Sequence, residues 1–265
     1  MKYMHFNSSC SYAGVANMLE MLGYDTEDYK IALDMGLPYL LRYDMESEAY
    51  QAGPMLQSAE WFNLYLRPRG FEYREQRMEK FKVPDYLRPG MMLGIQVTPK
   101  SKHAVVFLEK KENSYVFLNN KWEESEEPDV LKLSEEECLE HLPEQVMLGY
   151  VEQCEVLTID MQPYYEEALE TWEKLRKELH VFVSAVRTSE ELKASMNRLF
   201  RPLLLDGLSM AKLLKDEELA GKLEIMQQKF LGIVRRNQEV CPAEEISCGE
   251  IDWVVARFVG MITRK

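Results

Sequence analysis

The chain reads Asn7-Ser8-Ser9-Cys10-Ser11-Tyr12-Ala13-Gly14 where its first helix should begin. Apolar side chains then recur at helical spacing, at Tyr12, Val15, Ala16, Leu19 and Leu22. The unpaired N–H groups and the positive dipole end of a first helical turn favour a thiolate, which is the reactive form of cysteine. Cys10 is therefore a candidate nucleophile. A small buried cysteine with no chemical role would fit the same pattern.

A histidine stands at the start of a predicted strand, in the segment Lys102-His103-Ala104-Val105-Val106-Phe107. The β-branched and aromatic residues that follow it are typical of strands. A base at this place would be held on a rigid element, so His103 is a candidate general base. The alternative is a surface histidine that merely begins a strand.

Two asparagines, Asn119 and Asn120, follow the next predicted strand, residues 114–118. The charged segment 110–113 between the two strands predicts a hairpin turn, which would bring His103 near position 118 or 119. A catalytic histidine needs an orienting residue that accepts a hydrogen bond from its second ring nitrogen, and Asn119 could supply it. The alternative is that the two asparagines form an ordinary turn.

Helical patterns precede strand patterns in the first part of the chain. We expect helices over residues 9–22, 27–35 and 55–66, irregular structure over 36–54, strands over 91–98, 104–109 and 114–118, a capped helix over 134–142, and one or two strands over 146–159. This order predicts an α+β domain whose helices pack on an antiparallel sheet.

The strand signals end near residue 160. Long amphipathic stretches follow over residues 163–186, 189–214, 216–237 and 247–263, and Pro202 should break or kink the second. These stretches predict an all-α helical bundle. We therefore divide the chain into a catalytic domain, residues 1–158, and a C-terminal helical bundle, residues 159–265.

The composition disfavours several classes of function. The net charge is −13, and residues 1–154 hold 16 Lys/Arg against 26 Asp/Glu, a net of −10. This charge disfavours a nucleic-acid or anionic-membrane surface, because such binding is driven by basic patches. Five cysteines without a CxxC pair indicate reduced thiols rather than a disulfide framework. The four histidines lack zinc-ligand spacing, so we expect no metal and no other cofactor.

The N-terminal residues lack the basic start and apolar core of a secretory signal. No run of about 18 apolar residues predicts a membrane span. We therefore expect a cytoplasmic protein.

Together, the cysteine and histidine segments resemble a known family. A cysteine at a helix start, His-Ala-Val-Val-Phe on a strand, and a polar residue sixteen positions after the histidine form a layout similar to papain-like bacteriocin-leader peptidases. The stretch Asn7–Leu19 resembles still more the N-terminal domain of the butirosin-biosynthesis acyltransferase family, whose members move acyl groups from carrier proteins to amines. The resemblance covers about residues 1–155. It implies a papain-like fold with Cys10 as nucleophile, His103 as base and Asn119 as the orienting residue.

The chain departs from the peptidase pattern at two places. The peptidases usually have aspartate followed by proline where this chain has Asn119 followed by Asn120. They also place a glutamine several residues before the cysteine to bind the oxyanion, and no glutamine precedes Cys10. We name Asn7 and Gln96 as oxyanion candidates in its place. The missing glutamine argues against efficient amide hydrolysis.

These features predict a thiol-dependent acyl-transfer enzyme, an acyltransferase or an amidase or peptidase, that works through a thioester at Cys10. Tyr12 and Trp61 are candidate substrate-binding residues. The expected partner is an acyl or peptide substrate, which a carrier protein could present, and the helical region could form a homodimer. The alternative is a non-catalytic papain-like domain that binds a peptide or a small molecule.

Overall fold

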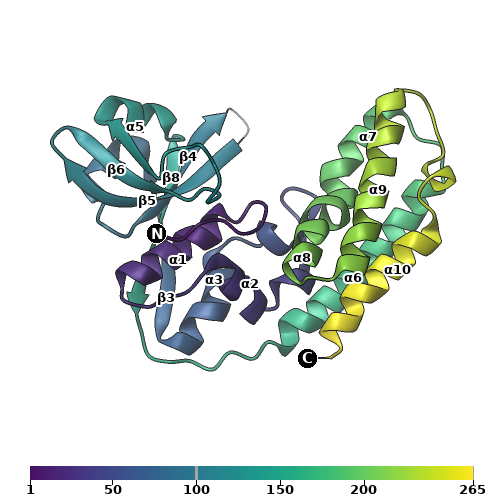
Figure 1. Ribbon diagram of the computed structural model, residues 1–265, viewed down its shortest axis with the longest axis horizontal. Helices are drawn as coiled ribbons and strands as arrows, with labels where there is room; N and C mark the ends of the chain where they lie inside the picture. The colour runs from purple at the N-terminus through teal and green to yellow at the C-terminus, as the bar shows by residue number, and fades with distance from the viewer. Residues whose placement is uncertain (99–100, 265) are drawn as a thin grey trace. The chain divides into compact units, whose positions relative to one another are not determined.

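The chain folds into two compact units (Figure 1). In the computed structural model, which describes residues 1–98 and 101–264, unit 1 comprises Met1–Met35 and Gln57–Ile159, and unit 2 comprises Gly36–Leu56 and Asp160–Lys265. We expected residues 36–56 within the first domain, but their contacts are with unit 2. The expected fold class, helices and an antiparallel sheet followed by an all-α region, is confirmed. No helix of the described residues is long and apolar enough to cross a membrane.

Unit 1 combines a sheet of antiparallel strands in the order β3-β8-β4-β5-β6-β7 with several helices. The strands are β3 (Phe71–Glu79), β4 (Met92–Thr98), β5 (Ser101–Lys111), β6 (Ser114–Asn119), β7 (Val130–Ser134) and β8 (Gln145–Gln153). The α-helices are α1 (Cys10–Met21), α2 (Asp28–Asp34), α3 (Ala59–Leu66), α4 (Val83–Tyr86) and α5 (Glu135–His141). The expected capping box of α5, Ser134 with Glu137, is present.

Helix α1 is the buried helix of unit 1. Its apolar residues Tyr12, Val15 and Leu19 are fully buried, and it packs on β5. A side-chain carbon added at Gly14 would lie 2.3 Å from the Met92 sulfur and 2.9 Å from the Asn120 amide nitrogen. Glycine at position 14 therefore lets α1 approach the sheet closely, and this approach sets the position of Cys10 at the helix start.

Two strands of the sheet, β3 and β7, were not expected from the sequence. The middle of β3 is charged and exposed, so its composition does not show the β-branched enrichment of a strand. Its backbone nevertheless pairs with β8 from Phe71↔Gln153 to Glu79↔Gln145. These residues form a strand because they pair with β8 in the folded sheet, and not because their own side chains favour a strand.

Unit 2 packs long helices around a two-stranded hairpin. The helices are α6 (Gln162–Val183), α7 (Ser189–Ser195), α8 (Leu208–Leu213), α9 (Glu217–Arg236) and α10 (Cys248–Ile262), and the strands are β1 (Leu41–Asp44) and β2 (Ala49–Ala52). The expectation of irregular structure over residues 36–54 was wrong. These four-residue strands are too short to show a period, and the hairpin is held by packing against α6.

The core of unit 2 is centred on Trp172 of α6. Its ring is fully buried and stacks on Phe258 of α10 with centroids 4.8 Å apart. Its indole N–H donates to the Tyr39 carbonyl oxygen at 2.8 Å, which ties the 36–56 segment to α6.

Pro202 does not break the helical stretch that contains it. The chain passes it in two π-helical segments, Met196–Phe200 and Pro202–Gly207, that lead into α8. A side-chain carbon at Gly207 would lie 2.6 Å from the Pro202 carbonyl oxygen, so glycine leaves room for the wider turn. The turn also brings Arg201 and the buried Asp206 together, with Nε donating to Oδ2 at 3.0 Å.

Candidate active site

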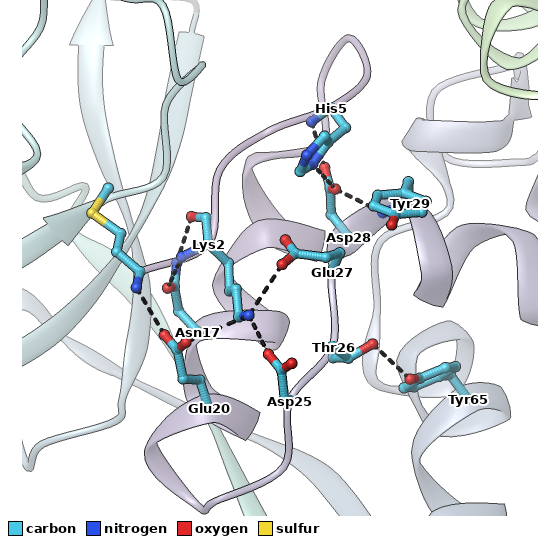
Figure 2. Close-up of polar contacts among 11 residues, drawn as sticks. Lys2, His5, Asn17, Glu20, Asp25, Thr26, Glu27, Asp28, Tyr29 and Tyr65 are labelled. Carbon is cyan, nitrogen blue, oxygen red and sulfur yellow. Dashed lines mark hydrogen bonds and ion pairs between the residues drawn. The ribbon is translucent and has the colours of Figure 1, made fainter.

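Cys10 is the first residue of α1, where the helix presents unpaired N–H groups and its positive end. The loop before it is fixed by the buried carboxylate of Asp28 on α2. The Ser9 hydroxyl and the His5 backbone N–H both donate to Asp28 Oδ2 at 2.8 Å. Figure 2 shows His5 and Tyr29 converging on this carboxylate. The position of Cys10 is therefore set from both sides, by its helix and by its anchored loop.

A chain of buried amides connects α1 to the sheet. The Asn17 side chain exchanges hydrogen bonds with the Lys2 backbone, at 2.7 and 3.1 Å, as Figure 2 shows. Its Nδ2 also donates to Asn120 Oδ1 at 2.9 Å, and Asn120 Nδ2 donates to the Ala104 carbonyl oxygen at 2.9 Å. Both amides are almost fully buried. They hold the start of β5, which carries His103, against the helix that carries Cys10.

The His103 ring is oriented by Asn119, with Nε2 2.7 Å from Asn119 Oδ1. The Asn119 amide nitrogen donates to the Pro128 carbonyl oxygen at 3.0 Å and to Glu127 Oε2 at 3.3 Å. Both of these partners can only accept, so the amide cannot be flipped and Oδ1 must face the histidine. The proton of neutral His103 therefore lies on Nε2. Nδ1 is the ring atom left for the Cys10 thiol, whose interaction with the ring raises the pKa of His103.

The electrostatics of the pair favour thiolate and imidazolium. Burial by itself would raise the pKa of the Cys10 thiol, but hydrogen bonds from the His103 ring and the Ala104 backbone N–H outweigh it and lower the pKa. Burial by itself would lower the pKa of His103, but its contacts with Cys10 and Asn119 raise it above the ordinary 6.5. Opposite shifts of this kind are expected where a thiol transfers its proton to an adjacent imidazole.

A cavity of about 190 Å³ opens beside Cys10. Its walls come from α1, α3 and the sheet, and include Phe62, Tyr73, Met92 and Met147. The Phe62 and Tyr73 rings meet edge to face with centroids 5.0 Å apart. The cavity is large enough for a small acyl group and is apolar along most of its wall.

Gln57 is the residue of this site that the sequence did not reveal. It lines the cavity, its Oε1 accepts from the Ser11 hydroxyl at 2.7 Å, and its Nε2 donates to the Ser8 carbonyl oxygen at 3.1 Å. The amide group therefore lies against the residues that flank Cys10. Gln57 stands in a loop far along the chain from the cysteine, and no local pattern marks it.

The structure brings together Cys10, His103 and Asn119, but not the other candidates. Asn7 is exposed and Gln96 is half-buried, and neither lines the cavity; the Gln96 carbonyl oxygen accepts from His141 Nδ1 instead.

The two residues named as substrate contacts are also placed elsewhere. The Tyr12 ring is fully buried and packs against Phe6 and Phe62, and Trp61 is buried. Neither lines the cavity, because their side chains belong to the core beneath it. Phe62, one position after Trp61, is the aromatic residue of α3 that reaches it.

The described residues include no group of three or more His, Cys, Asp or Glu side chains that could hold a metal ion. The groups at this site include the Cys10 thiol, the His103 imidazole and the Gln57 amide, together with the charged side chains of Glu75 and Lys102. Such a set can form and resolve a covalent thioester.

No family model and no curated protein matches the chain. Among solved structures, the peptidase domain of Streptococcus ComA, a bi-functional ABC transporter involved in a quorum-sensing pathway, is similar at 14% sequence identity. The match covers 56% of this chain and 96% of that chain, with a TM-score of 0.39.

Proposed function

We propose that this protein is a papain-like cysteine enzyme that transfers acyl groups through a thioester on Cys10. The observation that carries the proposal is the orientation of His103. Its Nε2 proton is held by Asn119 Oδ1 at 2.7 Å, so Nδ1 is directed to the thiol that begins α1. The lowered pKa of Cys10, in spite of the desolvation of its thiol, is the expected consequence of that arrangement.

In the first half-reaction, the Cys10 thiolate attacks the acyl carbonyl carbon and forms the carbon–sulfur bond. The oxygen becomes an oxyanion, for which the Cys10 backbone N–H and the Gln57 amide are the proposed donors. The tetrahedral intermediate collapses, the bond to the leaving group breaks, and His103 Nδ1 gives its proton to that group. The products are the acyl-enzyme thioester and neutral His103.

In the second half-reaction, an amine or a water molecule attacks the thioester carbonyl, and His103 Nδ1 takes the proton of the attacking group. The Cys10 thiolate then leaves, and the resting ion pair is restored. An amine acceptor makes the enzyme an acyltransferase, whereas water makes it an amidase or a peptidase. The resemblance of residues 7–19 to butirosin-biosynthesis acyltransferases favours an amine acceptor and a donor bound to a carrier protein.

Intact-protein mass spectrometry with a butyryl N-acetylcysteamine thioester tests the proposal. We expect one butyryl adduct, mapped to Cys10, and none on Cys10→Ala. The half-exposed thiols Cys154, Cys241 and Cys248 are internal controls in the same chain. Adding a small primary amine or water alone then measures how the adduct is resolved.

An adduct spread evenly over the thiols, or a Cys10 that remains unmodified, would contradict the proposal. That result would favour the alternative, a non-catalytic domain that binds a peptide or a small molecule.

We also propose a cytoplasmic location, since all five cysteines are free thiols. A homodimer through the helical region is a separate proposal, which light scattering on the full chain tests.

A further inference from the structure

The cavity beside Cys10 is lined by two charged side chains of opposite sign, Glu75 of β3 and Lys102 of β5. Neither forms a hydrogen bond or an ion pair with another residue in the described part of the chain. Other glutamates of β3 are paired, since Glu72 contacts Arg67 and Glu79 contacts Lys82. Glu75 and Lys102 are thus charged residues of the sheet that line the cavity beside Cys10 and have no charged partner in the described part of the chain.

The surroundings of Glu75 suit a cation. Its backbone pairs with Gly149, which has no side chain, and the Tyr73 ring leans over that glycine. Tyr73 and Glu75 are two positions apart on β3, so their side chains lie on the same face of the sheet, and both line the cavity. Glu75 is exposed, and the remaining desolvation of its carboxylate raises its pKa. A carboxylate next to aromatic rings is the chemistry that binds an ammonium group.

Lys102 lies on a different part of the wall. Its aliphatic carbons lie 3.8 Å from the position that a side-chain carbon would take at Gly94, which also lines the cavity. Its ammonium repels a second cation, whereas the Glu75 carboxylate attracts it. The two charges together orient any acyl group that has a charged end.

We propose that the cavity selects acyl groups that carry a primary ammonium, with Glu75 as the residue that binds it. This inference rests on the proposed thioester chemistry, since the cavity would hold the acyl group while its carbonyl carbon is joined to Cys10. Both Glu75 and Lys102 are exposed, so a carboxylate–ammonium contact at Glu75 is worth about threefold in rate, as for other exposed pairs.

The test compares two pairs of N-acetylcysteamine thioesters that differ only in the end group: β-alanyl against butyryl, and 6-aminohexanoyl against heptanoyl. The rate of Cys10 acylation is measured by mass spectrometry and divided by the rate of each thioester with free N-acetylcysteine, which removes intrinsic reactivity. We expect an ammonium preference of about threefold in at least one pair, and its loss in Glu75→Gln.

Glu152→Gln is the matched control, because it removes one negative charge from β8 at a residue that pairs with Arg74 and does not line the cavity. The control should keep the preference. Equal rates for the paired thioesters, or a preference that survives Glu75→Gln, would overturn this inference while the acyl-transfer proposal stands. Failure of all four thioesters to acylate a Cys10 that iodoacetamide still alkylates overturns the proposed function itself.

Discussion

Unit 1 and unit 2 connect their buried polar side chains differently. In unit 1 they bond across elements: Asn17 of α1 reaches Asn120 beyond β6, and Asn63 of α3 bonds the backbone of Tyr73. In unit 2 the buried hydroxyl and carboxylate groups bond within their own helical stretch, since Ser195 donates to the Leu192 carbonyl oxygen and Asp206 pairs with Arg201, although the Trp172 indole N–H reaches the Tyr39 carbonyl oxygen. Cross-element bonds specify a relative position, which a catalytic pair on two elements requires, whereas apolar packing is sufficient for a helical bundle.

The largest effect should follow from breaking the contact between the helix and the sheet at the catalytic pair. In His103→Ala, burial remains and raises the pKa of Cys10, while the hydrogen bond that lowers it is lost. We expect alkylation by iodoacetamide at pH 7 to slow by about tenfold or more. The midpoint of the pH–rate profile should move to higher pH in the variant than in the wild-type protein. Cys154 reports on general reactivity, and an unchanged Cys10 profile would contradict the assigned pair.

Asn17→Ala and Ser195→Ala compare how much one buried hydrogen-bonding side chain contributes to the unfolding free energy in each unit. Asn17→Ala leaves the Lys2 backbone N–H and the Asn120 Oδ1 without their partner in a buried place, at a cost of about 2 kcal/mol of unfolding free energy. Ser195→Ala in unit 2 removes only a bond within one helix and should cost less than about 1 kcal/mol. Urea unfolding of both variants measures the contrast. Equal losses would remove the distinction between the units.

A pair of glycine substitutions tests the close approach of α1 to the sheet. Gly14→Ala forces a carbon against the Met92 sulfur and the fixed Asn120 amide, and should cost about 1–2 kcal/mol. Gly221→Ala, in α9, meets no atom within 4 Å and should stabilise by about 0.5–1 kcal/mol through helix propensity. Thermal melts give both values, and a tolerated alanine at position 14 would show that α1 can shift.

The smallest effect concerns Asp206, whose buried Oδ1 has no hydrogen-bond partner among the described residues. Burial raises its pKa to about 6, although Arg201 opposes the shift. Because the folded protein holds the proton more tightly than the unfolded chain, Asp206 favours folding more at low pH, and this contribution falls as the pH rises from about 4 through 6. The wild-type protein should gain about 1 kcal/mol relative to Asp206→Asn between pH 7.5 and pH 5. Urea unfolding at the two pH values checks this, and a constant difference would contradict it.

Much of unit 1 was predictable because its signals are local. The start of α1 at Cys10, the strand that carries His103 and the capping box at Ser134 each follow from a short pattern. The hairpin between β5 and β6 led to Asn119 in the same way. The charged strand β3 and Gln57 were missed, because each is placed by partners that lie far away in sequence.

The sequence pattern also could not show that Tyr12 and Trp61, which we predicted to contact the substrate, lie away from the cavity. Tyr12 and Trp61 have the residue type and spacing of a helix face, but the period of a helix does not tell whether that face meets a cavity or a core. Both meet the core. The charges of Glu75 and Lys102 were equally invisible, since their unpaired state is a property of the folded sheet.

The division of unit 2 into two separate segments has a consequence for how the protein is made. All of unit 1 has been synthesised once Ile159 is added, whereas the 36–56 segment must wait for α6, whose Trp172 bonds to Tyr39. Until α6 emerges from the ribosome, Leu37, Leu40 and Leu41, which are buried in the finished protein, lack the helix that covers them. Translation that pauses after unit 1 has emerged and before α6 has followed would thus expose an apolar loop that chaperones can bind.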